Sequence, residues 1–427
     1  MAKKKKKEKP QREVTKRQLS RWQQQKRRQR IIFGLGIIII VAVLGVVGTA
    51  WYINEYHPRH QTVITVNDTE FNMDYYLKML KIHGEGQPSY YMYSLVDEVT
   101  KIIERNELIR QEAMELNISV SNDEVKERLK SSDPPLSNDY RDLVRTELLV
   151  DKLLDEHFEH EVPVFAEQRH IMAMFLESES QATEARARLE SGEDFADLAA
   201  ELSMQSFSIE QEGDLGWHPE EIFNMQLGSS IPVEYAFSSE VGVLSQPLHD
   251  EDKTKGVGYW LIKVLERKEA EEEEEAHVQA ILLGSEAEAR EVRDRLEAGE
   301  DFAALAEELS RDAVSKENGG DLDWLTPATM GSAFDEFVFD PEVELDMLSE
   351  PVRDYMVATT GGYWLVKVVA IEDNRPIEDD DRDSLKAKVL YEWIEMLLDD
   401  PENMVDDSYL DDEKKAWAVE KVTGGQN

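Results

Sequence analysis

The sequence predicts an α+β protein in which a helical module precedes two similar domains, each with helices covering a sheet, behind a single N-terminal transmembrane helix. Three observations lead to this prediction. The chain of 427 residues contains an internal duplication, each copy is bounded by short apolar runs, and an uncharged apolar stretch stands near the N-terminus. The residues after that stretch are numerous enough for two to four domains.

The uncharged stretch from Ile31 to Ile53 has the length of a membrane span. Its 23 residues, at about 1.5 Å rise per residue, cover the ~30 Å hydrocarbon core of a bilayer. Residues 1–30 form a basic tail with 14 Lys or Arg and two Glu, which by the positive-inside rule stays in the cytoplasm. We therefore expect a single-pass protein of the cell membrane, with its N-terminus cytoplasmic and the bulk of the chain extracytoplasmic.

A cleaved signal peptide is the alternative interpretation of the same stretch. Gly48-Thr49-Ala50 would be its small-residue cleavage site. However, the apolar run is longer than the ~7–15 residues of a signal peptide, and the basic lead is long. The chain has no Cys, which excludes disulfides and a lipid-modified Cys anchor and fits an extracytoplasmic location.

The chain after Arg30 is strongly acidic. Subtracting the tail's 14 basic and two acidic residues from totals of 48 and 90 leaves 34 and 88, a net charge of −54 over 397 residues. The electrostatic field of this negative charge repels nucleic acid and favours cationic partners. Unfolded polypeptides with basic stretches are one class of such partners. Solubility alone is an equally good explanation of the charge.

Residues 54–163 are expected to form an all-α module. After a short strand-like stretch, Val63 to Val66, come amphipathic segments that we expect to be helices, at 94–116, 123–129 and 140–158. Ser121 with Glu124 three residues later is a capping-box signature for the second of them.

The duplication is clearest between residues 186–203 and 293–310, where 14 of 18 positions are identical at an offset of 107. Each copy opens with a short apolar run typical of a buried strand, continues with helical spacing, and closes with Gly-Tyr-Trp-Leu-Ile/Val-Lys-Val, which is typical of a strand. Each copy is therefore expected to form an α+β domain that ends in its own closing strand. The predicted ranges are 164–268 and 276–375 for the two domains, 269–275 for an acidic linker and 376–427 for a C-terminal helical segment that docks on the helical module.

The motifs of both copies resemble those of the parvulin family of peptidyl-prolyl isomerases. They are an opening His, Gly-Glu-Asp-Phe-Ala before a helix, a Ser-x-Asp-x-x-Ser type segment, Gly-Asp-Leu-x-Trp and the closing Gly-Tyr-Trp strand. The region from Asn106 is similar to the N-terminal chaperone domain of the SurA type. The whole chain resembles membrane-tethered foldases of the SurA, PrsA and PpiD kind, and the resemblance covers about four-fifths of it.

The resemblance implies a site in the second copy. His277, Asp312 and Thr359 fall at the family's catalytic positions, Met330 and Phe334 at the positions that grip the proline ring, and the family's closing histidine is Trp364 here. We count Trp364 with the substrate-binding residues. Isomerisation about a proline bond needs no metal or cofactor, and we expect none.

The first copy departs further from the family's pattern. His170 is kept, Trp260 stands at the closing histidine position, Gln205 replaces the acidic residue and Lys255 falls at the hydroxyl position. We expect this copy to bind substrate, through His170 and Trp260, rather than to catalyse.

Two functions follow from the resemblance. One is an extracytoplasmic, membrane-tethered peptidyl-prolyl isomerase whose second copy acts on unfolded or newly translocated polypeptides with X-Pro bonds. The other is a holdase chaperone that binds unfolded clients without isomerising them, which the Trp at both closing positions favours. A passive envelope scaffold is a third class of function. It would not explain why residues typical of the family's proline pocket stand at the matching positions of this chain.

Overall fold

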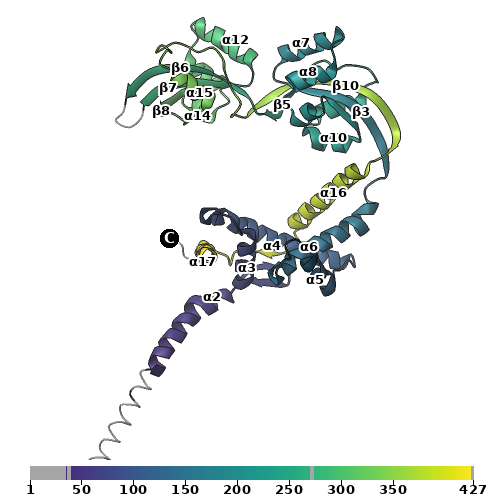
Figure 1. The fold of residues 1–427 in the computed structure, drawn as a ribbon, viewed down its shortest axis with the longest axis vertical. Helices are drawn as coiled ribbons and strands as arrows, with labels where there is room; N and C mark the ends of the chain where they lie inside the picture. The colour runs from purple at the N-terminus through teal and green to yellow at the C-terminus, as the bar shows by residue number, and fades with distance from the viewer. Residues whose placement is uncertain (1–34, 36–39, 270–273, 425–427) are drawn as a thin grey trace, which may run out of the picture. The chain divides into compact units, whose positions relative to one another are not determined.

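The computed structural model describes residue 35, residues 40–269 and residues 274–424. The described chain combines helices and sheets, which confirms the α+β class, and it divides into two compact units (Figure 1). The terminal unit joins Met1–His157 with Leu390–Asn427, and the repeat unit is Phe158–Val389.

The predicted transmembrane helix is wrong for the described residues. Within these ranges, no helix is both long enough and apolar enough to cross a membrane. Residues 31–34 and 36–39 of the predicted span lie outside the described chain.

The terminal unit is mainly helical but also holds a small sheet, so the prediction of an all-α module needs correction. Strand β1 (Thr62–Val66) lies between β2 (Thr69–Asn72) and β11 (Val405–Asp406), antiparallel to both. Its branched residues Val63, Ile64 and Val66 are fully buried, which is why this short run pairs as a strand. The other elements of the unit are η1 (Tyr52–Tyr56), α2 (His57–Arg59), α3 (Met73–His83), η2 (Ser89–Tyr91), α4 (Met92–Glu115), α5 (Asn122–Ser131), η3 (Asn138–Tyr140), α6 (Arg141–Lys152), η4 (Leu153–His157) and α17 (Asp412–Thr423).

Segments from both ends of the chain build the core of the terminal unit. Leu410, Ala418 and Val419 of the C-terminal segment pack in one cluster with α3, α4 and β1. This confirms that the C-terminal segment docks on the helical module. The capping box is also confirmed, because Ser121 accepts the backbone N–H of Glu124 and the Glu124 carboxylate accepts that of Ser121.

The repeat unit contains two antiparallel four-stranded sheets with helices on both faces (Figure 1). The first repeat supplies η5 (Phe158–His160), β3 (Phe165–Leu176), α7 (Glu179–Glu190), α8 (Phe195–Leu202), α9 (Ser206–Glu210), β4 (Asp214–His218), α10 (Glu220–Leu227), α11 (Ile231–Ser238), β5 (Leu248–Lys255) and β6 (Gly258–Glu269). The second supplies β7 (Glu274–Leu283), α12 (Glu286–Glu297), α13 (Phe302–Leu309), α14 (Ala313–Glu317), β8 (Asp321–Leu325), α15 (Ser332–Val338), β9 (Val352–Asp354) and β10 (Thr359–Pro376). Helix α16 (Asp379–Asp399) follows and runs on into the terminal unit.

The two repeats exchange their closing strands, which the sequence did not lead us to expect. The first sheet has the order β4-β3-β10-β5, and the second has the order β8-β7-β6-β9. Thus β10, from the second repeat, completes the first sheet, and β6, from the first repeat, completes the second. The acidic run 269–275 is not a linker between separate sheets, because β6 and β7 pair with each other up to Glu269 and Glu274. The domain ranges given above stay predictions.

Alternation along the exchanged strands places different side chains on the two faces of each sheet. In the second sheet, Tyr259 and Leu261 pack with α12 and α13, whereas Trp260 and Ile262 pack with α15. In the first sheet, Leu365 packs with α7 and α8, and Trp364 packs with α10 and α11. Each closing tryptophan therefore faces the helix that follows the Gly-Asp-Leu-x-Trp segment of the other repeat.

Candidate functional site

The predicted proline-binding residues of the second sheet lie where α15 packs on β6. The rings of Trp260 and Phe334 meet edge to face, with centroids 5.0 Å apart and an interplanar angle of 79°. Both side chains are buried, and Met330 packs beside them while keeping part of its surface exposed. Because Met330 is partly exposed, it is the member of the predicted proline-binding pair that a substrate can reach.

Met356 is an exposed apolar side chain close to the start of α15. It is 78% exposed, on the connection between β9 and β10. A Cβ placed on Gly331 would lie 3.9 Å from the Met356 Cβ. Met330 and Met356 are thus the accessible apolar side chains at this end of α15, with the aromatic pair buried in the core of the second sheet.

Asp354 is the polar group behind this surface. Its carboxylate is 2% exposed and accepts the indole N–H of Trp260 at 3.2 Å and the backbone N–H of Met356 at 2.8 Å. The first sheet repeats the arrangement, because Asp250 is 4% exposed and accepts the indole N–H of Trp364 at 2.9 Å. Sequence reasoning missed both carboxylates, although each stands at the same spacing before a Gly-Tyr-Trp triplet.

The structure places Trp364 away from the residues with which we grouped it. Trp364 packs against Phe175 of β3, with ring centroids 4.9 Å apart, and belongs to the core of the first sheet. Trp260, which we assigned to the first copy, stands beside Phe334 in the second. Strand exchange is the physical reason for both corrections.

The three residues predicted to be catalytic have separate partners. His277 Nε2 lies 2.8 Å from Asp321 Oδ1, and Asp312 caps α14 by accepting the backbone N–H of Ser315 at 2.8 Å. The hydroxyl of Thr359 is buried and donates to the carbonyl of Val257 at 2.6 Å. None of these contacts joins one of the three side chains to another.

Asp321 ties His277 to strand β8. Burial raises the pKa of Asp321, but hydrogen bonds from the backbone N–H of Asp323 and from His277 outweigh it and hold the pKa below its usual range. The His277 ring also lies 5.5 Å from the ring of Trp324. The contact is a feature of both repeats, because His170 Nε2 lies 2.5 Å from Asp214 Oδ1 and its ring lies 5.8 Å from Trp217.

In the first copy, the two residues that replace the family's site residues make structural contacts. Gln205 caps α9 by accepting the backbone N–H of Ser208 and donates to the carbonyl of Gln226. Lys255 is 3% exposed, donates to the carbonyl of Gly361, and has its pKa lowered to about 8, mainly by burial and further by the nearby Arg311. Lys255 thus lies at the end of β5, where it pairs with Thr359 at the start of β10 and where the chain turns toward β6.

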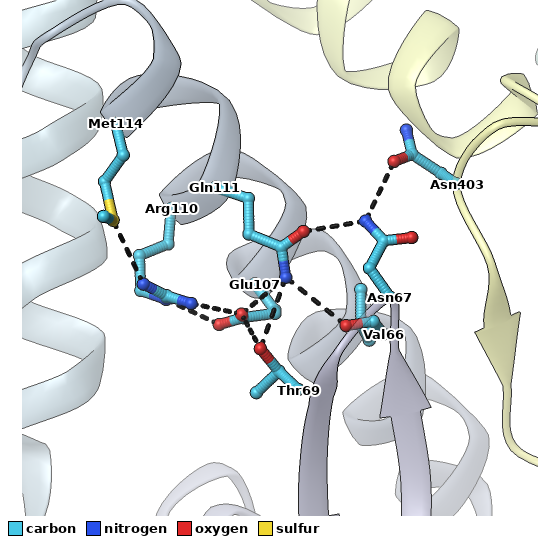
Figure 2. Close-up of polar contacts among 8 residues, drawn as sticks. All are labelled: Val66, Asn67, Thr69, Glu107, Arg110, Gln111, Met114 and Asn403. Carbon is cyan, nitrogen blue, oxygen red and sulfur yellow. Dashed lines mark hydrogen bonds and ion pairs between the residues drawn. The ribbon is translucent and has the colours of Figure 1, made fainter.

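The terminal unit has a polar network of its own, centred on a buried carboxylate (Figure 2). Glu107 accepts hydrogen bonds from Thr69, Gln111 and Arg110. Burial raises the pKa of Glu107, but these hydrogen bonds outweigh it and hold the pKa below its usual range. Asn67, at the turn between β1 and β2, links Gln111 to Asn403, so the network joins the β-hairpin, α4 and the C-terminal segment.

A cavity of about 380 Å³ lies beside this network. Phe71, Tyr75 and Ile103 give it apolar walls, and Glu107 and Arg110 give it polar ones. Over the part of the chain that is described, no three His, Asp or Glu side chains gather in a way that could hold a metal ion.

Comparison with known proteins identifies the repeats. Two family models, both described as the PPIC-type PPIASE domain, match residues 170–266 and 259–371. The chain is 30% identical over 227 residues to the chaperone SurA of Chromohalobacter salexigens, which is 50% of this chain and 47% of that protein. It is 33% identical over 125 residues to the foldase protein PrsA 4 of Bacillus cereus, which is 29% of this chain and 40% of that protein.

The relatives are matched only in part, since this chain spans about half the length of these curated proteins or less. The crystal structure of PrsA from Bacillus subtilis aligns over 86% of this chain and 94% of that one at 14% identity, with a TM-score of 0.20. The family matches confirm the predicted class of peptidyl-prolyl isomerase domains. The chain thus carries two PPIC-type peptidyl-prolyl isomerase domains of the parvulin kind in tandem, and it is similar to chaperones and foldases of the SurA and PrsA type.

Proposed function

We propose that this protein is a peptidyl-prolyl cis-trans isomerase that helps unfolded or newly translocated polypeptides to fold, and that its second domain is the active one. One observation carries the proposal: Met330 packs, partly exposed, against the cluster that contains the buried Trp260 and Phe334, and Met356 is exposed beside the start of α15. This surface can take up a proline ring and the apolar residues beside it. The first domain also has a partly exposed methionine, Met204, against the Trp364 cluster, but Gln205 stands there in place of the acidic residue.

The reaction suits a site of this kind. Rotation about an X-Pro bond meets a barrier of roughly 18–20 kcal/mol and takes tens to hundreds of seconds unaided. A catalyst needs only to bind the twisted amide better than either planar form. Met330 would hold the ring, Phe334 and Trp260 would keep water from it, and Asp354 would fix the Trp260 indole.

We also propose that the folded units work outside the cytoplasm, tethered at the membrane by the N-terminal segment. The support is in the sequence: the uncharged run 31–53 follows a tail with 14 Lys or Arg, and the chain has no Cys. Protease added outside intact cells should then digest the repeat unit. Full protection of residues beyond Tyr52 would reject this location.

A holdase without isomerase activity is the second candidate. Two observations favour it: His277, Asp312 and Thr359 are each held by a separate structural contact, and the chain after Arg30 has a net charge of −54 (34 basic against 88 acidic residues). Such a surface suits basic, unfolded clients.

Proline-limited refolding of a model protein, catalysed by the full chain, tests the proposal. Met330→Ala should lower the catalysed rate roughly ten-fold, and Met225→Ala, an exposed methionine of α10 in the first domain, is the matched control. Equal rates for wild type and Met330→Ala would exclude catalysis at this site. Suppression of client aggregation that both variants retain would then support the holdase.

A further inference from the structure

The exchange of closing strands is fastened by two reciprocal hydrogen bonds. Trp260 of the first repeat donates its indole N–H to Asp354 of the second, and Trp364 of the second repeat donates to Asp250 of the first. Each tryptophan is almost fully buried in the core of the sheet that it completes. The bonds therefore belong to the interior of each domain and are not contacts at its rim.

The exchange involves whole strands. In the second sheet, the pairing of β6 with β7 runs from Tyr259–Leu283 to Glu269–Glu274. In the first, the pairing of β10 with β3 runs from Tyr363–Leu176 to Pro376–Phe165. Neither four-stranded sheet would have its central pair of strands if the other repeat were removed.

The route of the chain explains why β6 does not return to its own repeat. Only Gly256 and Val257 separate β5 from β6. A two-residue hairpin needs left-handed backbone in its loop, yet neither residue has a positive φ, and Val is poorly suited to one. The connection is thus not a two-residue hairpin turn of that kind, and β6 pairs in the second sheet.

Several hydrogen bonds hold the crossing point, which is the place where the start of β10 lies beside the end of β5 and the connection to β6. Thr359 and Thr360 of β10 pair with Lys255 and Thr254 of β5. In addition, the Thr359 hydroxyl donates to the carbonyl of Val257, and Arg311 donates to the carbonyl of Thr360 at 2.7 Å. Lys255, which stands at the family's hydroxyl position in the first copy, helps to fix the crossing by donating to the carbonyl of Gly361.

We propose that each tryptophan shapes the proline-binding surface of the repeat to which it does not belong in sequence, so that the two PPIC-type domains form one obligate unit. Trp260 is then the positioning residue of the second proline-binding surface, because it packs against Phe334 in the cluster that carries Met330. Trp364 has the same role in the first domain, where it packs against Phe175. This assignment of roles rests on the proposed function, but the exchange that underlies it can be tested without any activity.

Disulfide trapping tests the exchange directly, because the chain has no Cys of its own. Met172 pairs with Lys367 across β3 and β10, and Lys263 is the counterpart of Lys367 in β6. We expect a disulfide in oxidised Met172→Cys/Lys367→Cys protein and none in Met172→Cys/Lys263→Cys protein, as read by mass spectrometry of linked peptides in the monomer. The reverse result would show that each repeat closes its own sheet and would overturn the proposal.

Catalysed refolding then tests the roles by double-mutant comparison. Trp260→Phe should lower the catalysed rate roughly three- to ten-fold and combine non-additively with Met330→Ala, because the two side chains belong to one packed cluster. The effects of Trp364→Phe and Met330→Ala should simply multiply. Coupling of Met330 to Trp364 and not to Trp260 would refute the assignment. If the chain proves to have no isomerase activity, the disulfides still decide the exchange.

Discussion

The carboxylate of Asp250 lies 2.9 Å from the indole nitrogen of Trp364, although 114 positions separate the two residues in the chain. The same oxygen accepts the hydroxyl of Ser229 at 2.5 Å, and the other oxygen accepts the backbone N–H of Lys253 at 3.1 Å. One buried side chain thus connects the exchanged strand β10 to β5 and to the loop before α11.

Asp250→Ala should therefore destabilise the first domain by roughly 1–3 kcal/mol, because it leaves the buried indole N–H without an acceptor. Asp250→Asn should cost less than half as much, since an amide oxygen can still accept. Urea unfolding followed by tryptophan fluorescence measures both. A loss below about 0.5 kcal/mol for Asp250→Ala would mean that this bond does not hold the exchanged strand.

Gly362 pairs with Asp250 of β5 just before β10 begins to pair with β3, and it has no room for a side chain. A Cβ there would lie 2.5 Å from Phe175 Cζ and 2.6 Å from the carbonyl oxygen of Leu176. We expect Gly362→Ala to lower the free energy of unfolding by roughly 1–3 kcal/mol. Gly256→Ala is the control, because nothing lies within 4 Å of its Cβ position. Similar losses for both variants would contradict the packing argument.

The sequence predicted local structure better than strand partners. Ser121 with Glu124, and the helical spacing within each repeat, depend on neighbouring residues, so their structure could be read from the chain. The partners of β6 and β10 could not, because the two strands differ only by Ile262 against Val366 within their shared seven residues. The shared residues therefore fit either sheet equally well, and the tertiary contacts of Val257 and Thr359, where β5, β6 and β10 meet, are not visible in the sequence pattern.

The candidate site was predicted in part for the same reason. Met330 and Phe334 lie in one segment of the second repeat, and the structure keeps them in one cluster. Trp364 was grouped with them because it follows in the same repeat, but strand exchange puts Trp260 there instead. The pairing of each tryptophan with an aspartate depends on tertiary structure, which sequence spacing alone does not specify.

The first turn of α16 is held to the first sheet by His218 and Asp381. Their side chains lie 2.6 Å apart, Nδ1 to Oδ2, and both are largely buried. Asp381→Ala should loosen this turn, and amide hydrogen exchange over residues 379–386 should be roughly ten-fold faster. Asp380→Ala, at an exposed neighbouring position, should leave the exchange rates unchanged. Equal protection in both variants would show that the pair does not anchor the helix.

Glu104 makes the stability of the terminal unit dependent on pH. Burial raises its pKa to about 7, and repulsion from Asp407 adds to the effect. In the unfolded chain the carboxyl ionises near its ordinary pKa of 4.5, so between pH 4.5 and 7 the folded state binds the extra proton. Stability therefore falls as pH rises through this interval and stays low above it.

Glu104→Gln replaces the carboxyl with a group that is neutral at every pH, so it should remove this loss. We expect the variant to be more stable than the wild type by on the order of 2 kcal/mol at pH 8 and nearly equal to it at pH 4. Calorimetry of the full chain at the two pH values measures the difference. Glu98→Gln, at an exposed position of the same helix, is the control. A gain for Glu104→Gln that is the same at both pH values would show that relief of packing strain, and not ionisation, is its cause.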